Sequence, residues 1–328
     1  MEFNAAAEKI YFSRHRRSFG LQRFHECALF DWGTSNLRAW VLNAGGEIER
    51  HIKSCKGADQ LSSDQFYNIT RDILHDLHVK SAPKTRIPII MCGMVGSRTG
   101  WVEAGYLPTP VHCQQIPQRP SHIETDDLNV FILPGLAVQR QEAPDILRGE
   151  ETQILGFYMQ RPDFRGLVCL PGTHSKWVSL NAGMVESFRT AMTGELFSLL
   201  AQHSVIRHVI GQDSAFPIDH PGFKTGVLEG FHHPERIIFD LFSIRAGGIL
   251  LSRLGEDASA CLSGLLIGAE ISCALKDKPS EQTIALLAAG RLALLYKLAF
   301  EYINVTIDLY DADHLVQDGL KFAAKQIF

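Results

Sequence analysis

The sequence has no CxxC pair, no long apolar run and no excess of basic charge. Its seven cysteines are scattered along 328 residues, which predicts reduced, buried thiols of a cytosolic protein rather than a disulfide framework. No uninterrupted apolar run approaches the roughly 20 residues that span a bilayer, so we expect no membrane segment. A formal net charge of −4 argues against nucleic acid as a partner, because nucleic-acid binders usually present a basic face. The expected location is the cytoplasm.

The length predicts two domains, and a composition with 45% hydrophobic and 21% charged residues is ordinary for a globular protein. We place the first domain at residues 27–150 and the second at residues 151–328. Residues 1–26 carry several basic residues but lack the apolar stretch of a signal peptide. We therefore expect them to form an extension outside the folded core.

The segment 29–40 predicts a β-hairpin with a small-residue tip. One apolar run ends at Asp31 and the turn Gly33-Thr34-Ser35, and a second apolar run leaves through Arg38. Backbone N–H groups and hydroxyls at such a turn can surround phosphate oxygens. Asp31 is a candidate Mg²⁺ ligand, because hard cations prefer carboxylate and water oxygens; the alternative is that Asp31 only caps the turn. Arg38 either stabilises transition-state charge or forms an ordinary ion pair.

A second hairpin of the same plan is predicted at residues 167–180. Two apolar strands flank the turn Pro171-Gly172-Thr173-His174-Ser175, with Lys176 at its exit. Around the hairpins, strands alternate with helices, which indicates an α/β architecture. We predict strands at residues 47–53, 87–92, 130–133, 283–287 and 306–310, and helices at residues 62–77, 150–159, 193–206, 240–254, 258–275, 290–302 and 315–326.

Three details of these helices are specific enough to test. Phe66, Ile69, Ile73 and Leu77 recur at spacings of three and four, which predicts the buried face of the helix at 62–77. In the helix at 193–206, we expect Thr193 to be the N-cap and Leu196, Leu199 and Leu200 to face inward. The pair His232-His233 is expected in a surface loop, because no third ligand stands at a useful spacing for a metal.

Two phosphate-binding hairpins, one near the start and one near the middle, resemble the actin/hexokinase ATPase superfamily. The chain from about residue 27 onward further resembles the 2-dehydro-3-deoxygalactonokinase family. The resemblance implies two actin-like (ribonuclease H-like) ATPase domains on either side of a nucleotide cleft. It implies ATP-dependent phosphorylation of the 6-hydroxyl of 2-dehydro-3-deoxy-D-galactonate, a step of galactonate breakdown. The segments that carry it are 29–40, 91–101, 134–136, 148–153, 171–176, 188–195 and 262–270.

The resemblance also implies where ATP and Mg²⁺ bind. Asp31 would hold the metal, and the phosphates would contact Gly33, Thr34, Ser35, Gly172, Thr173, His174 and Ser175, with Lys176 supplying charge. The position that opens the second turn is acidic in much of the superfamily but is Pro171 here, so a second metal carboxylate is in doubt. The adenosine element would lie at Gly290, where Ala288 and Ala289 replace the usual glycines.

Phosphoryl transfer also needs a general base and a site for the carboxylate of the sugar acid. Glu150 is the first candidate base, and Glu151 and Asp59 are the alternatives. The competing interpretation of Glu150 and Glu151 is that the helix dipole stabilises them and lowers their pKa values.

An arginine suits the sugar-acid carboxylate because its planar fork offers two donors. We assign this role to Arg98, with Arg148 as the alternative clamp, and we expect Ser97 and Trp101 to contact the sugar.

Two other functions remain open. The acceptor could be another sugar acid, such as 2-dehydro-3-deoxygluconate, or the chain could be a non-catalytic nucleotide-binding regulator. The expected partners are ATP and a small sugar acid, and a homodimer is left open.

Overall fold

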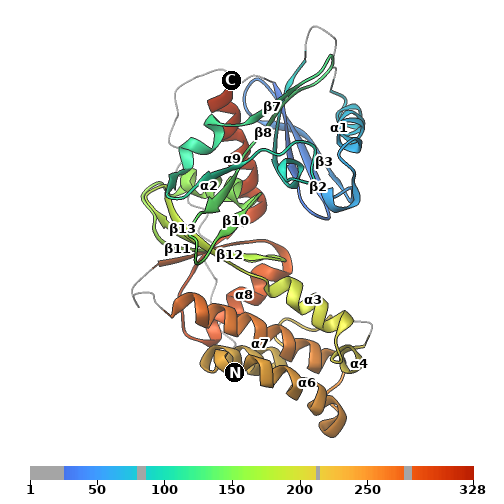
Figure 1. Cartoon of the computed structure of the whole chain (residues 1–328), viewed down its shortest axis with the longest axis vertical. Coiled ribbons are helices and arrows are strands. Elements are labelled where there is room, and N and C mark those ends of the chain that lie inside the picture. Colours follow the sequence, from blue (N-terminus) through green and yellow to red (C-terminus); the bar gives the residue numbers. More distant parts are fainter. Residues whose placement is uncertain (1–25, 80–85, 212–214, 277–282) are drawn as a thin grey trace, which may run out of the picture.

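The computed structural model describes residues 26–79, 86–211, 215–276 and 283–328. The chain forms an upper part with the N-terminal strands and a lower part with most of the helices, and helices α2 and α9 lie between the two sheets (Figure 1). The extension expected at residues 1–26 lies outside the described residues except for Glu26.

The first sheet confirms the N-terminal hairpin. Its strands follow the order β3-β2-β1-β4-β8-β7. The pairs β3–β2 and β2–β1 are antiparallel, and the pairs β1–β4 and β4–β8 are parallel. Helix α1 (Gln65–Asp76) covers one face, with Phe66, Ile69 and Ile73 in the same buried cluster as Phe30 and Trp32. The strands are β1 (Cys27–Trp32), β2 (Leu37–Leu42), β3 (Ile48–Ser54), β4 (Pro88–Gly93), β7 (Ser121–Glu124) and β8 (Asn129–Ile132).

The second sheet repeats the same plan. Its order is β15-β14-β11-β12-β13-β6, again with an antiparallel meander of three strands followed by two parallel strands. The repeated order confirms two domains of one ribonuclease H-like, actin-like architecture. The strands are β11 (Arg165–Leu170), β12 (Ser175–Asn181), β13 (Met184–Ala191), β14 (Thr283–Ala288), β15 (Asp308–Asp311) and the short β6 (Val111–His112). A small third sheet holds β5 (Tyr106–Pro108), β9 (Gly135–Val138) and β10 (Asp145–Leu147).

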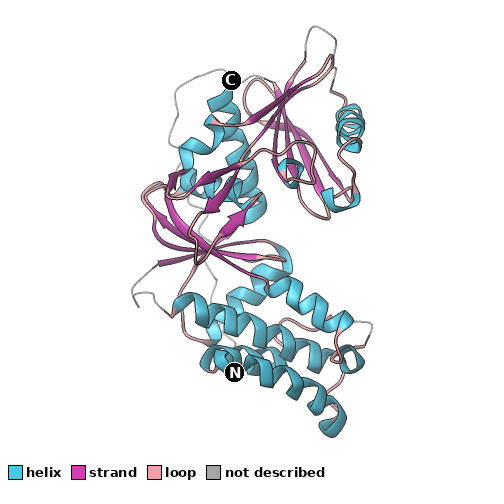
Figure 2. Ribbon diagram, in the orientation of Figure 1, coloured by secondary structure: helices cyan, strands magenta, loops and turns pink. Residues whose placement is uncertain are grey.

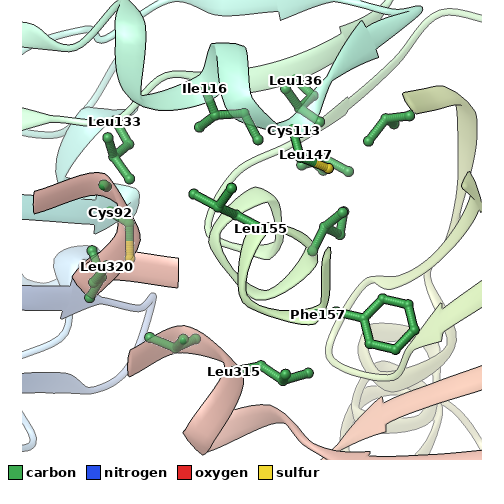
Figure 3. Close-up of a cluster of buried hydrophobic side chains, with 14 of the residues drawn as sticks. Cys92, Cys113, Ile116, Leu133, Leu136, Leu147, Leu155, Phe157, Leu315 and Leu320 are labelled. Carbon is green, nitrogen blue, oxygen red and sulfur yellow. The ribbon is translucent and has the colours of Figure 1, made fainter. Parts of the chain in front are cut away.

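Helices α2 (Glu150–Gln160) and α9 (Ala312–Ile327) join the two sheets. They approach so closely that a Cβ on Gly156 would lie 2.0 Å from the Leu315 carbonyl oxygen, and one on Gly319 would lie 2.1 Å from that of Thr152. The buried cluster around these helices contains strand residues of both sheets, and Leu155 and Leu320 point into it (Figure 3). One core therefore spans both halves of the molecule.

The remaining helices gather below the second sheet (Figure 2). They are α3 (Thr193–His203), α4 (Arg207–Ile210), α5 (Pro221–His232), α6 (Ile237–Leu251), α7 (Glu256–Leu275) and α8 (Gly290–Tyr302). Among the described residues, α7 alone is long and apolar enough to cross a membrane, but 72% of its apolar window is buried. Its Gly264 and Gly268 pack against the backbone of α5, so its apolar composition is that of a core helix.

The structure corrects several expectations in this region. Leu196 and Leu199 are 42% and 44% exposed, so the expectation that they face inward is wrong. Met192, not Thr193, is the N-cap of α3, which ends at His203. The helix expected at 240–254 spans Ile237–Leu251, and α5, which the sequence did not predict, contains His232. Strands β5, β6, β7, β9, β10 and β13 were also not predicted.

Candidate active site

The first turn is hydrogen-bonded to the backbone of the segment 57–59. The Gly33 N–H donates to the Asn36 carbonyl at 2.8 Å, and the Asp59 N–H donates to the Thr34 carbonyl at 3.0 Å. A Cβ on Gly57 would lie 2.2 Å from the Thr34 carbonyl oxygen, so only glycine permits this contact. Thr34 and Ser35 remain exposed at the tip. The structure therefore brings the candidate base Asp59 next to the predicted phosphate turn.

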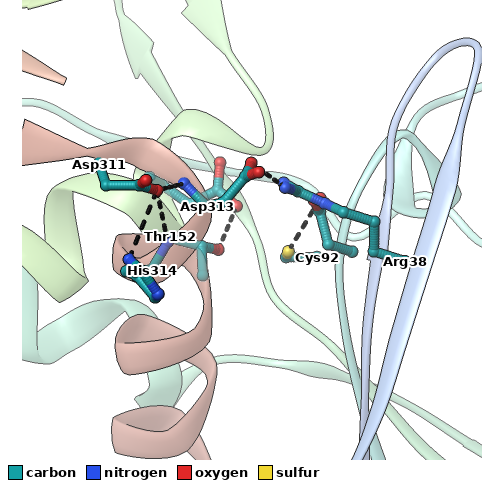
Figure 4. Close-up of polar contacts among 8 residues, drawn as sticks. Arg38, Cys92, Thr152, Asp311, Asp313 and His314 are labelled. Atoms are coloured by element: carbon teal, nitrogen blue, oxygen red, sulfur yellow. Dashed lines mark hydrogen bonds and ion pairs between the residues drawn. The ribbon is translucent and has the colours of Figure 1, made fainter. Parts of the chain in front are cut away.

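Asp31 belongs to a charged network near the end of β1, and Figure 4 labels Arg38, Cys92 and Asp313 of this network. The Arg38 Nε donates to Asp31 Oδ2 at 2.9 Å, and the same guanidinium is ion-paired with Asp313 in the first turn of α9. Asp311 caps α9 by accepting from the N–H groups of Asp313 and His314. Burial acts to lower the pKa of Arg38, but the two carboxylates outweigh it and raise this pKa. The ion pair expected as one role of Arg38 is thus present.

The donor set beside the first turn fits Mg²⁺ only as part of a nucleotide complex. Within the described residues, no group of three or more His, Cys, Asp or Glu side chains could hold a metal ion. Mg²⁺ is usually bound by one or two carboxylates together with phosphates and waters. Asp31, a partly exposed carboxylate at a strand end beside the turn, can supply such a ligand.

The second turn is held by the start of α3. The Glu195 N–H donates to the Thr173 carbonyl at 3.0 Å, and a Cβ on Gly194 would lie 2.6 Å from the Gly172 carbonyl oxygen. The His174 Nε2 and the Glu195 Oε2 are 2.6 Å apart, so this histidine has a structural partner.

The residues of the second turn differ in how accessible they are to solvent. Space around the Gly172 Cα is open, and Thr173 is exposed. Lys176 is only 5% exposed. The Ser175 hydroxyl is buried and lies 3.0 Å from the Tyr296 hydroxyl, so that hydroxyl is not presented at the turn.

A buried carboxylate, not singled out from the sequence, lies beneath this turn. Glu270 of α7 accepts from the Trp177 Nε1 at 2.8 Å, from the Tyr296 hydroxyl at 2.7 Å and from the Thr193 hydroxyl. Burial raises the pKa of Glu270, against the effect of its hydrogen bonds. The segment 262–270 supports the family resemblance, and a single carboxylate within an apolar helix was the available signal. Glu270 joins β12, α3 and α8 beneath the second turn.

Glu150 and Glu151 open α2 after Gly149, whose φ of +103° favours glycine. The Glu150 Oε2 accepts from the Arg148 N–H at 3.0 Å, whereas Glu151 accepts from the Gly149 N–H and from the Thr152 hydroxyl. Burial raises the pKa of Glu150, and raises that of Glu151 to about 7 with a further contribution from the Glu150 charge. The expectation that the helix dipole lowers these pKa values is wrong, because burial outweighs it.

These two neighbouring carboxylates have different electrostatic partners. Lys176 and His174 of the second hairpin act electrostatically on Glu150. Glu151 acts on the Cys92 thiol of β4, whose pKa is raised by burial and by Asp31 and Glu151; this thiol is 3.6 Å from Asp31 Oδ1. The start of α2 is therefore connected to the second hairpin directly and to Asp31 through Cys92.

The predicted sugar-acid residues lie near the same helix start. Arg98 is exposed, Ser97 is buried with its hydroxyl 3.4 Å from that of Thr99, and the half-buried Trp101 ring contacts Tyr67.

Arg148 stacks over the Tyr106 ring at 4.4 Å and donates through Nη2 to the Gly105 carbonyl, while its buried Nε and Nη1 find no partner among the described residues. A Cβ on Gly96 would lie 2.7 Å from the Arg148 Nη1. The loop that carries Arg98 and the side chain of Arg148 thus adjoin.

Gly290, predicted for the adenosine, begins α8 with a φ of +59° and open space around its Cα. Ala288, one of the residues in place of the usual glycines, is buried. Helix α8 also carries Tyr296, which connects it to Ser175 after the second turn.

Comparisons with known proteins show which family the chain resembles. The family model for 2-keto-3-deoxy-galactonokinase matches residues 31–323. The chain is 40% identical over 301 residues to a Rhizobium meliloti (strain 1021) protein assigned as a 2-dehydro-3-deoxygalactonokinase, covering 92% of this chain and 97% of the relative. It is 32% identical over 299 residues to the 2-dehydro-3-deoxygalactonokinase of Escherichia coli (strain K12), covering 90% and 97%.

A solved structure is similar over the same length. A Sinorhizobium meliloti protein described as a candidate 2-dehydro-3-deoxygalactonokinase superposes with a TM-score of 0.87 at 38% identity, covering 92% of this chain and 99% of that chain. The match to the family model extends from Asp31 in the first hairpin into α9, and so includes both turns and the start of α2. The chain therefore belongs to the 2-keto-3-deoxy-galactonokinase family.

Proposed function

We propose that this chain phosphorylates the 6-hydroxyl of 2-dehydro-3-deoxy-D-galactonate with ATP, giving the 6-phosphate and ADP, in galactonate catabolism. The observation that carries the proposal is the match of residues 31–323 to the family model, together with a relative of the same assignment at 40% identity. Membership of a kinase family favours this activity over a non-catalytic regulator. It also favours galactonate over gluconate chemistry as the acceptor.

In the proposed mechanism, the ATP phosphates are held by the two hairpin turns. The first turn contributes Thr34 and Ser35 with Gly33, and the second contributes Gly172, Thr173 and His174. Lys176, buried beside the second turn, offsets phosphate charge. Asp31 would hold Mg²⁺, which would supply positive charge to offset that of the phosphates. Gly290 at the start of α8 borders the adenosine.

Glu150 is the proposed general base. It takes the proton of the 6-hydroxyl as that oxygen forms its bond to the γ-phosphorus and the bond to the leaving ADP oxygen breaks. A pKa raised by burial brings this carboxyl closer to neutrality, where a base is most effective. Glu151 is less suited, because it is fully buried and inaccessible to a substrate, whereas Glu150 is half-buried.

The substrate carboxylate is assigned to Arg98, whose exposed guanidinium is available to a ligand. Ser97 and Trp101 of the same loop border the sugar carbons. Arg148 is the alternative, supported by its unpartnered buried nitrogens. We further propose that the enzyme acts in the cytoplasm as a homodimer, on small molecules rather than on nucleic acid or at a membrane.

A coupled ADP-release assay tests the activity. The purified chain is offered 2-dehydro-3-deoxygalactonate, 2-dehydro-3-deoxygluconate and a neutral deoxy sugar with ATP and Mg²⁺. We expect the highest kcat/KM with the galactonate derivative. A clear preference for the gluconate epimer would change the substrate, and no ADP release with any acceptor would support a regulator.

A further inference from the structure

Helix α6 presents an apolar face that nothing in the described chain covers. Its opposite side is fully engaged: Ile244 is buried, Gly248 lies against Val209, and Leu241 packs on the same cluster. Away from this contact, six large apolar side chains are between 61% and 79% exposed; they are Ile238, Phe239, Phe242, Ile249 and Leu250 along the outer side and Leu251 at the end of the helix. We call these six residues the α6 patch. Figure 1 shows α6 at the outer edge of the lower part.

The α6 patch is large for an exposed apolar surface. At these exposures the six side chains leave several hundred Å² open to solvent, since an aromatic side chain alone buries roughly 150–250 Å² and two of the six are aromatic. A stable protein–protein interface takes about 800 Å² from each partner. Contiguous apolar patches above a few hundred Å² on a monomer mark interaction surfaces.

The spacing within the patch is that of a helix-packing seam. Phe239, Phe242, Ala246 and Ile249 follow one another at intervals of three, four and three residues, which places them along one line of the helix. Ala246, small and near the middle, allows a second helix to approach closely. Such a seam fits a partner helix better than a globular ligand.

The charges near the patch favour a second copy over a lipid surface. Arg236 pairs with Asp240 at 3.2 Å, and the Arg245 Nη1 donates to the Val205 carbonyl at 2.9 Å, so the arginine at the N-cap of α6 and the arginine on the helix itself are both engaged within the chain. Helices that lie on membranes usually present free Lys and Arg to anionic headgroups. A twofold interface requires a surface that complements itself, and an uncharged apolar seam meets its own copy without like-charge repulsion.

We propose that the α6 patch is the interface of a twofold homodimer, formed by packing α6 of one copy against α6 of the other. The proposal gives a location to the homodimer included in the proposed function but does not depend on the kinase chemistry. Mass measured without ATP therefore separates the two: a failed phosphorylation assay would leave the dimer standing, and a monomer would leave the kinase standing.

The test is the solution mass of the full chain by light scattering and sedimentation equilibrium over a concentration series. We expect twice the mass of the chain, and the double variant Phe239→Glu/Phe242→Glu should return to the mass of one chain with an unchanged circular dichroism spectrum. Leu309→Glu replaces an apolar residue of β15 that is 46% exposed, and this matched control should remain dimeric.

A wild-type protein that is monomeric at every concentration would overturn the proposal, and so would a double variant that stays dimeric. Two further results would assign the patch to another occupant. A wild-type monomer that dimerises only after deletion of residues 1–25 would assign the patch to that segment, and a monomer that sediments with anionic vesicles would assign it to a lipid surface.

Discussion

Asp31 is ion-paired with Arg38. It also stands at the strand end beside the first turn, where we propose that it binds Mg²⁺. We expect Asp31→Asn to lower kcat by about 100-fold or more, because the charge that directs Mg²⁺ to the phosphates is lost. Steady-state kinetics over a Mg²⁺ series measures this. Asp313→Asn is the matched control, as it removes the other carboxylate on Arg38. Near-wild-type turnover in a folded Asp31→Asn protein would refute the metal role.

Replacing the carboxylate by its amide at Glu150 and at Asp59 tests which of the two residues is the general base. Glu150→Gln should lower kcat by roughly 10²–10⁴-fold with little change in the KM for ATP, because base removal acts on proton transfer. Asp59→Asn, at an exposed position behind the first turn, should keep most activity. If the two results are exchanged, the base is Asp59 and the role of Glu150 is structural.

Glu151 makes the stability depend on pH. Its pKa of about 7 in the folded chain exceeds the ordinary value near 4.5, so between these values the folded state binds more protons than the unfolded state. The free energy of unfolding therefore falls as pH rises through this window, by up to about 3 kcal/mol, and levels off above it. Glu151→Gln should reduce this slope. Urea unfolding at several pH values measures it, and equal slopes in both proteins would contradict the shift.

At the scale of elements, the second turn depends on a carboxylate beneath it. Glu270→Gln should lower the free energy of unfolding by about 1–3 kcal/mol, because one of the donors from Trp177, Tyr296 or Thr193 loses a charged acceptor. It should also raise the KM for ATP more than that for the sugar acid, since Thr193 and Ser175 flank the turn.

The control for this prediction is Glu256→Gln, an exposed position at the start of the same helix. It should change neither quantity. Equal increases in both KM values would show that Glu270 supports the fold in general and not the second turn.

Short-range patterns predicted the hairpins and most helices, because a hairpin tip such as Gly33-Thr34-Ser35 and the spacing of Phe66, Ile69 and Ile73 are local. The predictions that failed concern properties that depend on tertiary structure. Periodicity identifies the apolar face of α3 but not whether another element covers it, so Leu196 and Leu199 were placed wrongly. Burial of Glu150 reversed the direction of its expected pKa shift.

Residues that are distant in sequence account for what was missed at the site. Arg38 and Asp313 are 275 residues apart, and Thr193 and Glu270 are 77 apart. No local pattern links such pairs. The assignment of particular residues to ATP, the base and the sugar acid stays a prediction that kinetics must decide.

For the whole molecule, the shared core around α2 and α9 joins the two halves. Gly156→Ala places a methyl group against the Leu315 carbonyl oxygen and should lower the free energy of unfolding by about 1–3 kcal/mol. Gly247→Ala adds a methyl group where the nearest atom is 3.7 Å away, so it should be neutral or slightly stabilising. Urea unfolding compares the two, and an equal effect would contradict the tight contact.

The same crossing has a mechanical consequence. At Gly156 the facing atoms are backbone atoms of α9, and at Gly319 they are the Thr152 backbone and the Thr152 methyl group. Relative rotation of two ordinary helices requires interlocked side chains to change rotamer, whereas a contact made mostly by backbone atoms can pivot with little of that rearrangement. At the start of α2, Glu150 interacts with the second hairpin, and Glu151 interacts with Cys92 of β4 beside Asp31. A few degrees of rotation there would change the surroundings of both carboxylates at once. Closure on the two substrates and the pKa of the base would then depend on a single motion.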